Sequence, residues 1–197
     1  VLAHGAAAAL VAGLALPRRG PALVWQRILG LVAGSWEGAL GRTWRIAVRR
    51  VDGVVALTRS MEEETRRIGF GGPLWVIPNA RRVERFVAVD RTAAARAIRE
   101  ELGVGPSVPL VGLVGYLVEQ KAPARAVEVV AALRAEDVDV HLVVVGDGPL
   151  RPAVRARAAE LGVADHVSVL GHRDDVERLL GGLDVLVLTS DDEGVPG

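Results

Sequence analysis

The chain has 197 residues, half of them hydrophobic, and its 24 basic and 24 acidic side chains cancel. This provides enough apolar material for one large or two small domains. The neutral balance argues against a protein that coats nucleic acid. Because the chain has no cysteine, disulfides, thiolate metal sites and cysteine nucleophiles are excluded, and a reducing cytoplasm is a suitable environment.

The sequence starts at Val1 without a methionine and stops at Gly197 inside a loop motif, so we expect a fragment of a longer protein. One apolar run, residues 6–16, is shorter than the roughly 20 residues needed to span a bilayer. Arg18 and Arg19 follow this run, whereas the charges of a signal peptide precede its apolar segment. The run therefore predicts a buried helix.

The first half alternates expected strands and helices. One strand ends at the sequence VLAHG, and a short strand covers residues 21–25. A stripe with helical spacing follows, made of Trp36, Leu40, Trp44, Ala47, Val48 and Val51. Four arginines lie mostly off this stripe: Arg42, Arg45, Arg49 and Arg50. Such a stripe is typical of a helix packed on a sheet, which is the favoured interpretation. The alternative is a basic surface for anionic membrane lipid.

The next segments complete a first domain. Residues 52–58 predict a buried strand, and Ser60 is expected to cap a helix with glutamates in its first turn. A strand at residues 74–77 ends at Pro78. Residues 79–90 show no clear period, and we expect them to join two domains.

The second half has a regular α/β pattern after a helix at residues 92–102. Apolar strands at 108–115, 138–146, 166–171 and 183–189 alternate with helices at 123–135, 149–161 and 174–180. Four buried strands alternating with helices predict a parallel, doubly wound sheet.

Ligands of such sheets bind outside the carboxyl ends of the strands. Four loops should share that edge: residues 115–122, 146–149, 171–174 and 190–197. Lys121, the only lysine in the chain, lies near an expected helix start, and Pro123 and Pro149 are expected at or near first helical positions. Helix N-termini offer free N–H donors, and a lysine adds a point charge. This combination predicts a phosphorylated ligand, most simply a nucleotide diphosphate.

Two pairs of aspartates could be metal ligands. We instead expect Asp174 to cap a helix and Asp175 to lie in its first turn. Asp191 and Asp192 have no histidine or third carboxylate at metal-ligand spacing. No metal or other cofactor is expected.

Four segments of the second half, in their order and spacing, resemble glycosyltransferase family 4, the group 1 retaining glycosyltransferases with the GT-B fold. They are VGLVGYLVEQKA, VVVGDGPLRPAV, VSVLGHRDDVERLL and DVLVLTSDDEGVPG. AHG, VDGVVALTRSMEEE and VIPNA in the first half fit as well. The resemblance implies two Rossmann-like domains. Residues 1–78 would be part of the N-terminal, acceptor-side domain, and residues 79–197 a truncated C-terminal domain that binds the nucleotide-sugar donor.

The resemblance also implies donor-binding residues. Lys121 matches a diphosphate-binding lysine, but Tyr116 stands where an arginine is expected after Gly115. Tyrosine offers a phosphate one hydrogen bond and no charge. Gly146 and Gly148 match a turn near the nucleotide, and the loop containing Gly171 and Arg173 matches one that reads the base. Ala122 replaces the usual glycine, which is expected to be a mild change.

The resemblance further implies that Glu193 binds sugar hydroxyls, while the N–H groups of Gly194 and Val195 meet the sugar and the phosphate. Glu193 would be the first of two motif glutamates, the second lying beyond Gly197. His4 matches a histidine that faces the donor sugar.

The implied activity is transfer of a hexose from a nucleotide-diphosphate sugar to a sugar, lipid or small-molecule acceptor, with no nucleic-acid partner. We expect a cytoplasmic enzyme with peripheral contact at the inner face of the membrane, and an inactive fragment. The alternatives are a sugar-nucleotide epimerase or phosphorylase on the same fold, and a degenerate domain that only binds.

Overall fold

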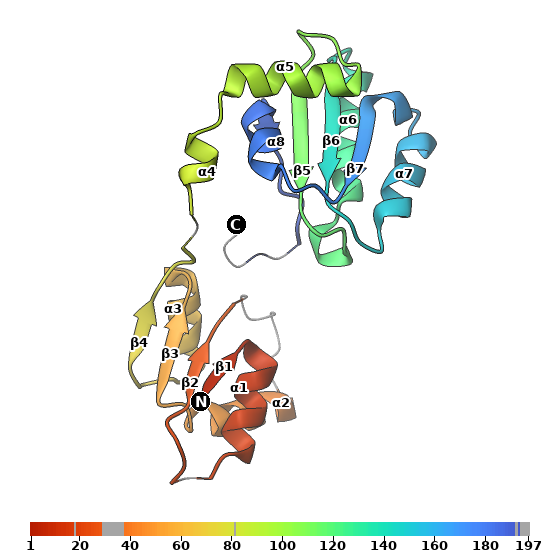
Figure 1. The fold of residues 1–197 in the computed structure, drawn as a ribbon. Helices are drawn as coiled ribbons and strands as arrows, with labels where there is room; N and C mark the ends of the chain where they lie inside the picture. Colours follow the sequence, from red (N-terminus) through yellow and green to blue (C-terminus); the bar gives the residue numbers. More distant parts are fainter. Residues whose placement is uncertain (18, 29–37, 81, 192, 194–197) are drawn as a thin grey trace. The chain divides into compact units, whose positions relative to one another are not determined.

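The structure, a computed structural model, describes residues 1–17, 19–28, 38–80, 82–191 and 193. Its contacts divide the chain into two compact units, drawn in Figure 1. Among the described residues, the first comprises residues 1–80 and Glu193, and the second runs from Arg82 to Asp191.

The first unit is a sheet of four parallel strands in the order β1-β2-β3-β4. The strands are β1 (Leu2–His4), β2 (Val24–Gln26), β3 (Gly53–Ala56) and β4 (Leu74–Val76). The helices are α1 (Ala6–Ala15), α2 (Gly38–Val48) and α3 (Arg59–Arg67). Trp25 of β2 and Trp44 of α2 form the centre of its core, with ring centroids 5.4 Å apart.

The amphipathic stripe on α2 packs against the core, as favoured from its spacing. Trp44, Ala47 and Val48 are buried, and so is Val51 just beyond the helix. Trp36 and the side chain of Leu40 lie outside the part of the chain that the structure describes. The outer side of α2 nevertheless exposes Arg42 and Arg45, and Arg49 is exposed directly after the helix.

The N-cap predicted for α3, Ser60, was wrong, because the actual N-cap is Thr58, two residues earlier. Thr58 has an extended backbone, and its hydroxyl accepts a hydrogen bond from the N–H of Met61 at 3.1 Å. Ser60 is already inside the helix, which begins at Arg59. A side-chain oxygen can cap only from a non-helical residue that precedes the first turn, so Thr58 is the N-cap.

The second unit is also a sheet of four parallel strands, in the order β7-β6-β5-β8. The strands are β5 (Leu110–Val114), β6 (His141–Val145), β7 (Val167–Gly171) and β8 (Val185–Leu186). The helices are α4 (Glu84–Val87), α5 (Arg91–Leu102), α6 (Ala124–Ala135), α7 (Arg151–Glu160) and α8 (Val176–Gly182), with 3-10 turns η1 (Glu119–Lys121) and η2 (Ala164–His166).

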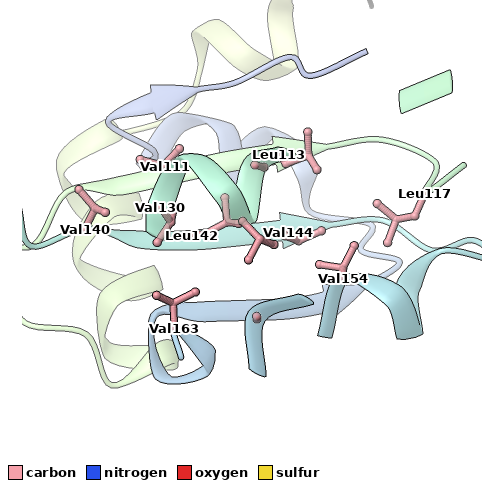
Figure 2. Close-up of a cluster of buried hydrophobic side chains, with 12 residues drawn as sticks. Val111, Leu113, Leu117, Val130, Val140, Leu142, Val144, Val154 and Val163 are labelled. Carbon is pink, nitrogen blue, oxygen red and sulfur yellow. The ribbon is translucent and has the colours of Figure 1, made fainter. Parts of the chain in front are cut away.

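Strand β6 shows why this sheet is covered by helices on both faces. Its side chains alternate, as those of any strand do. Leu142 and Val144 pack in a cluster with Val130 of α6 and Val154 of α7, as Figure 2 shows. Val143 and Val145 pack with the opposite cluster, which contains Ile98 of α5 and Leu179 of α8. The expected doubly wound α/β architecture is confirmed.

Two details of this unit differ from expectation. Strand β8 pairs only over Val185–Leu186, and both side chains are half exposed because the strand lies at the edge of the sheet. Pro149 lies in a turn, and α7 begins at Arg151 with Pro152 in its first turn. The N–H of Leu150 donates to the carbonyl of Leu117, so the chain becomes helical only after that contact.

Candidate functional site

Three of the four expected loops meet at the carboxyl edge of the second sheet. The N–H of Gly115, after β5, donates to the carbonyl of Val145 at 3.0 Å. The N–H of Gly146, after β6, donates to the carbonyl of Gly171 at 2.7 Å. Backbone hydrogen bonds thus join the ends of neighbouring strands, which confirms the common edge for these loops.

Two glycines on this edge have positions that no other residue could take. Gly146 has a φ of 132°, and a Cβ there would lie 1.8 Å from the carbonyl oxygen of Gly115. Gly148 has a φ of 150°, and its Cβ would lie 2.5 Å from the carbonyl oxygen of Leu117. Glycine is needed because the loops touch through their backbones. The N–H groups of Gly115 and Gly146 serve these contacts and are not donors for a ligand.

Tyr116 lies beside the Gly146 loop, and its side chain is 63% exposed. The next residue holds the segment in place, since Leu117 donates its N–H to Asp147 and accepts from Leu150. The phenol hydroxyl is therefore presented at the edge by a fixed backbone. It can donate a hydrogen bond there but brings no positive charge.

Lys121 lies in the 3-10 turn η1, three residues before α6 begins at Ala124. The expectation that it stands at the helix start was therefore imprecise, because Pro123 is the N-cap and the lysine belongs to the turn before it. Its carbonyl accepts a hydrogen bond from the Thr189 hydroxyl at 2.8 Å. The neighbouring carbonyl of Gln120 accepts from the N–H of Asp191. The lysine loop and the segment after β8, which leads to Glu193, therefore lie side by side.

Ala122 has φ 41° and ψ 52°, a left-handed conformation. Such a backbone costs a residue with a Cβ about 1 kcal/mol or more. The exchange of glycine for alanine, expected to be mild, therefore strains the loop immediately after Lys121.

Asp191 is explained by an ion pair. Its carboxylate lies 2.6 Å from Arg125 of α6, and Arg125 also donates to the carbonyl of Thr189 at 3.2 Å. Within the described ranges, no cluster of three or more histidine, aspartate or glutamate residues could hold a metal ion. Asp191 instead helps to hold the segment after β8 against α6.

Arg173 takes part in a closed ring of charges. Its guanidinium binds Asp175 through Nε at 2.8 Å and Glu101 of α5 through Nη1 at 2.6 Å. Arg178 of α8 completes the ring by donating to both carboxylates. Hydrogen bonds from Arg173 hold the pKa of Asp175 well below its usual range, and the same bonds raise the pKa of Arg173.

This ring corrects the expected roles of the two aspartates. Asp175 is the residue before α8, and its carboxylate binds arginines rather than capping the helix. Asp174 is fully exposed. The Arg173 side chain is therefore committed to carboxylates of its own unit.

Sequence reasoning missed Arg151, the first residue of α7. Its guanidinium packs on Gly171, where an added Cβ would lie 3.2 Å from Nη2. Its Nη1 lies 3.3 Å from the carboxylate of Asp147. Arg151 therefore places a positive charge between the Gly146 loop and the end of β7. Its position just before Pro152, at a helix start, was the available signal.

The remaining candidates lie elsewhere or are only partly described. His4 ends β1 in the first unit, is exposed, and has its Nδ1 3.2 Å from Oε1 of Gln26. Glu193 has a half-buried side chain. Gly194 and Val195 lie outside the described residues. No helix in the described ranges is long and apolar enough to cross a membrane.

Comparisons with known proteins identify a matching family and similar curated enzymes. Residues 108–197 match the family described as Glycosyl transferases group 1. The chain is 32% identical over 145 residues to the lipopolysaccharide core biosynthesis glycosyltransferase LpsE of Rhizobium meliloti, covering 74% of the chain and 39% of LpsE. It is 32% identical over 162 residues to 2-deoxystreptamine glucosyltransferase of Streptomyces kanamyceticus, covering 78% of the chain and 40% of that enzyme.

Solved structures show the same fold. Anabaena Alr3699/HepE in complex with UDP superposes with a TM-score of 0.71 at 21% identity, over 96% of this chain and 53% of HepE. This confirms the expected GT-B architecture of Rossmann-like units. The chain spans about two fifths of the length of the curated relatives above. Through the family match at residues 108–197 and the similarity to these relatives, the second unit belongs with the group 1 glycosyltransferases.

Proposed function

We propose that the whole protein is a retaining glycosyltransferase that transfers a hexose from a nucleotide-diphosphate sugar to an acceptor. The observation that carries the proposal is the position of Lys121. Its loop adjoins the glycine-lined edge on one side and, through Thr189, the segment that leads to Glu193 on the other. The similar HepE chain was solved with UDP and with UDP-glucose, which supports a nucleotide-sugar donor.

In this proposal, Lys121 stabilises the negative charge that grows on the leaving diphosphate as the glycosidic bond breaks. Arg151 adds a second positive charge on the same edge, where Tyr116 contributes none. Glu193 binds sugar hydroxyls, and His4 faces the donor sugar near the reacting carbon. The main chain of Gly171–Arg173 contacts the base. The reaction requires no metal or other cofactor, since these cations take over the neutralisation of the diphosphate.

The proposed acceptor is a sugar, a lipid or another small molecule. The protein is proposed to act in the cytoplasm, in peripheral contact with the inner face of the membrane. Nucleic acid is not a proposed partner, because the chain as a whole carries no basic excess.

The test uses the full-length protein and a panel of uridine- and guanosine-diphosphate sugars, with chelator present. We expect acceptor-dependent release of the nucleoside diphosphate, and a product with the anomeric configuration of the donor sugar by NMR. An inverted anomer would overturn the retaining mechanism. A chelator-sensitive rate would overturn metal independence.

A binding-only domain is the second candidate, because Tyr116 and Ala122 replace an expected arginine and glycine on the binding edge. Tight nucleotide binding without turnover, whatever acceptor is added, would favour it over transfer. Conversion of the sugar nucleotide to an isomer without an acceptor would indicate an epimerase, and a requirement for inorganic phosphate would indicate a phosphorylase.

A further inference from the structure

The positive charge of this neutral chain is concentrated at its start. Residues 1–51 contain seven arginines and one acidic residue, Glu37. The rest of the chain therefore carries an equal excess of acidic charge. Such segregation creates a local positive field on the first unit, which net charge alone conceals.

Helix α2 displays part of this charge on one side. Its buried side carries Trp44 and Val48, and the opposite side exposes Arg42 and Arg45. Arg49, directly after the helix, is exposed as well. Ile46 lies among these arginines and is 57% exposed. The outer stripe of α2 thus combines positive charge with an exposed aliphatic side chain.

Helix α1 is unusual for a helix at a protein surface, because none of its ten residues is polar. Ala9 and Gly13 are buried, but Val11 is 64% exposed and Leu14 is 48% exposed. A helix at a water interface normally carries polar residues on its outer side. An exposed apolar face of this kind marks a surface that contacts another apolar phase.

The two helices lie side by side, as Figure 1 shows. Their contact is close, because a Cβ on Gly13 would lie 2.8 Å from the carbonyl oxygen of Ala47. Leu14 and Ile46 are the chain neighbours of these two residues. The apolar stripe of α1 therefore adjoins the basic stripe of α2. We call these exposed residues the α1–α2 surface: Val11, Leu14, Arg42, Arg45, Ile46 and Arg49.

A cavity of about 450 Å³ opens where the ends of these helices meet. Its lining includes Arg49 and Arg50 beside Leu16, and Arg50 donates a hydrogen bond to the carbonyl of Leu16. The cavity also reaches Leu23 and Asp52, which precede β2 and β3. It therefore lies at the end of the sheet opposite His4, away from the carboxyl edge.

We infer that the α1–α2 surface docks on an anionic lipid bilayer. Val11, Leu14 and Ile46 would enter the interface, while the arginines contact lipid phosphates and the cavity receives a headgroup. An apolar helix beside a basic one is the pattern that binds such membranes. Nucleic acid would use the arginines but not the exposed aliphatic side chains. The inference specifies the membrane contact of the proposed function and does not depend on glycosyl transfer.

The test is flotation of the full-length protein with lipid vesicles. One set contains phosphatidylcholine alone, and the other contains about one third phosphatidylglycerol. We expect binding to the anionic vesicles only, weakened at least about tenfold when salt is raised from about 0.05 to about 0.5 M. Arg42→Glu with Arg45→Glu should weaken binding at least about tenfold. Val11→Ser with Leu14→Ser should weaken it by a smaller factor.

The matched control is Arg59→Glu with Arg67→Glu, which makes the same charge change on the exposed side of α3 in the same unit. It should retain at least about half of the wild-type binding. Equal losses in both arginine pairs would show general charge attraction and overturn the assignment of the surface. No binding at low salt would also overturn it. Displacement from the vesicles by millimolar glycerol phosphate would overturn it in favour of a soluble anion ligand. Self-association of the protein through this surface would overturn it as well.

Discussion

At the carboxyl edges of both sheets, backbone hydrogen bonds join the ends of neighbouring strands, but the groups that add to these bonds differ. In the second unit, the backbones of neighbouring loops bond directly, from Gly115 to Val145 and from Gly146 to Gly171. In the first unit, the N–H of Gly5 bonds to Gln26 and that of Arg27 to Val55 in the same way, and a buried side chain adds a link from the edge to α3. Arg27, just after β2, donates to Glu64 at 2.6 Å and to Thr65 at 2.8 Å on α3.

The difference indicates what each edge tolerates. In the second unit, the close approach of the loop backbones requires glycine at a few positions, such as Gly146 and Gly148. Nearby side chains such as that of Tyr116 remain exposed. An edge held by a buried guanidinium depends on one charged group and its partners. Burial lowers the pKa of Arg27, opposed by its hydrogen bond to Glu64. All four tryptophans lie in residues 1–80, so their fluorescence reports on the first unit, whereas circular dichroism reports on both.

The largest expected effect is that of Gly146→Ala. Its Cβ would overlap the Gly115 carbonyl, so we expect the second unit to lose about 4 kcal/mol or more of stability. Urea unfolding by circular dichroism should shift, while the tryptophan transition stays in place. The matched variant at the other edge is Gly5→Ala, where the nearest atom is a flexible Ile28 carbon at 3.3 Å. It should cost less, about 1–3 kcal/mol, because Gly5 has a backbone conformation that residues with a Cβ rarely adopt but meets no backbone atom. Equal losses of stability in Gly146→Ala and Gly5→Ala would contradict the stronger glycine requirement of the second edge.

Arg27→Met is expected to cost the first unit about 3 kcal/mol, because it leaves Glu64 without its buried cation. The tryptophan transition in urea should move to lower denaturant concentration. Adding Glu64→Gln should recover part of the lost stability, because an uncharged amide then replaces the carboxylate that has lost its cation. No recovery in the double variant would show that packing, rather than charge, is what Arg27 contributes.

Arg173→Met should destabilise the second unit by about 2 kcal/mol near neutral pH, by removing charge-assisted hydrogen bonds. The pKa of Asp175 is lowered in the folded protein. Its stabilisation is therefore present above the unfolded value of about 4 and is lost as the pH falls below it. Unfolding followed by circular dichroism should show a smaller loss of stability between about pH 5 and pH 2 in the variant. An unchanged acid dependence would show that the ring does not stabilise the fold.

Lys121→Ala in the full-length protein should weaken donor binding or turnover at least about tenfold, which corresponds to roughly 1.4 kcal/mol. His4→Ala, on the edge of the first sheet, should leave the affinity for the free nucleoside diphosphate unchanged, because its proposed contact is with the sugar. Calorimetric titration with the diphosphate checks both. Unchanged diphosphate affinity and turnover in Lys121→Ala would refute the phosphate role.

The smallest effect concerns Ala122. Ala122→Gly removes the strain of a left-handed alanine, and we expect the second unit to gain about 1 kcal/mol in stability. The thermal midpoint by circular dichroism should rise slightly. A lower midpoint would show that the loss of the methyl group outweighs the relief of backbone strain.

Much of the fold could be predicted because β5 and β6 are continuous apolar runs, and runs of that length between helical patterns read as buried parallel strands. The expectation that the loops share one edge followed from the same pattern. The caps were less predictable. Thr58 and Ser60 are both good capping residues, and only the backbone at Thr58 decides between them. The edge position of β8 could not be predicted either, because an apolar run does not reveal how many neighbours a strand has.

The sequence by itself determined the parallel α/β class and the place of Lys121 near the carboxyl edge, because apolar periodicity and the alternation of strands with helices are local properties that survive in a one-dimensional pattern. Only the tertiary structure decided that Gly146 packs against Gly115, that Arg173 is committed to Glu101 and Asp175, and that Arg151 lies on Gly171. These contacts join residues from different strands and helices. Their energies depend on distances of a few ångströms that no spacing along the chain encodes.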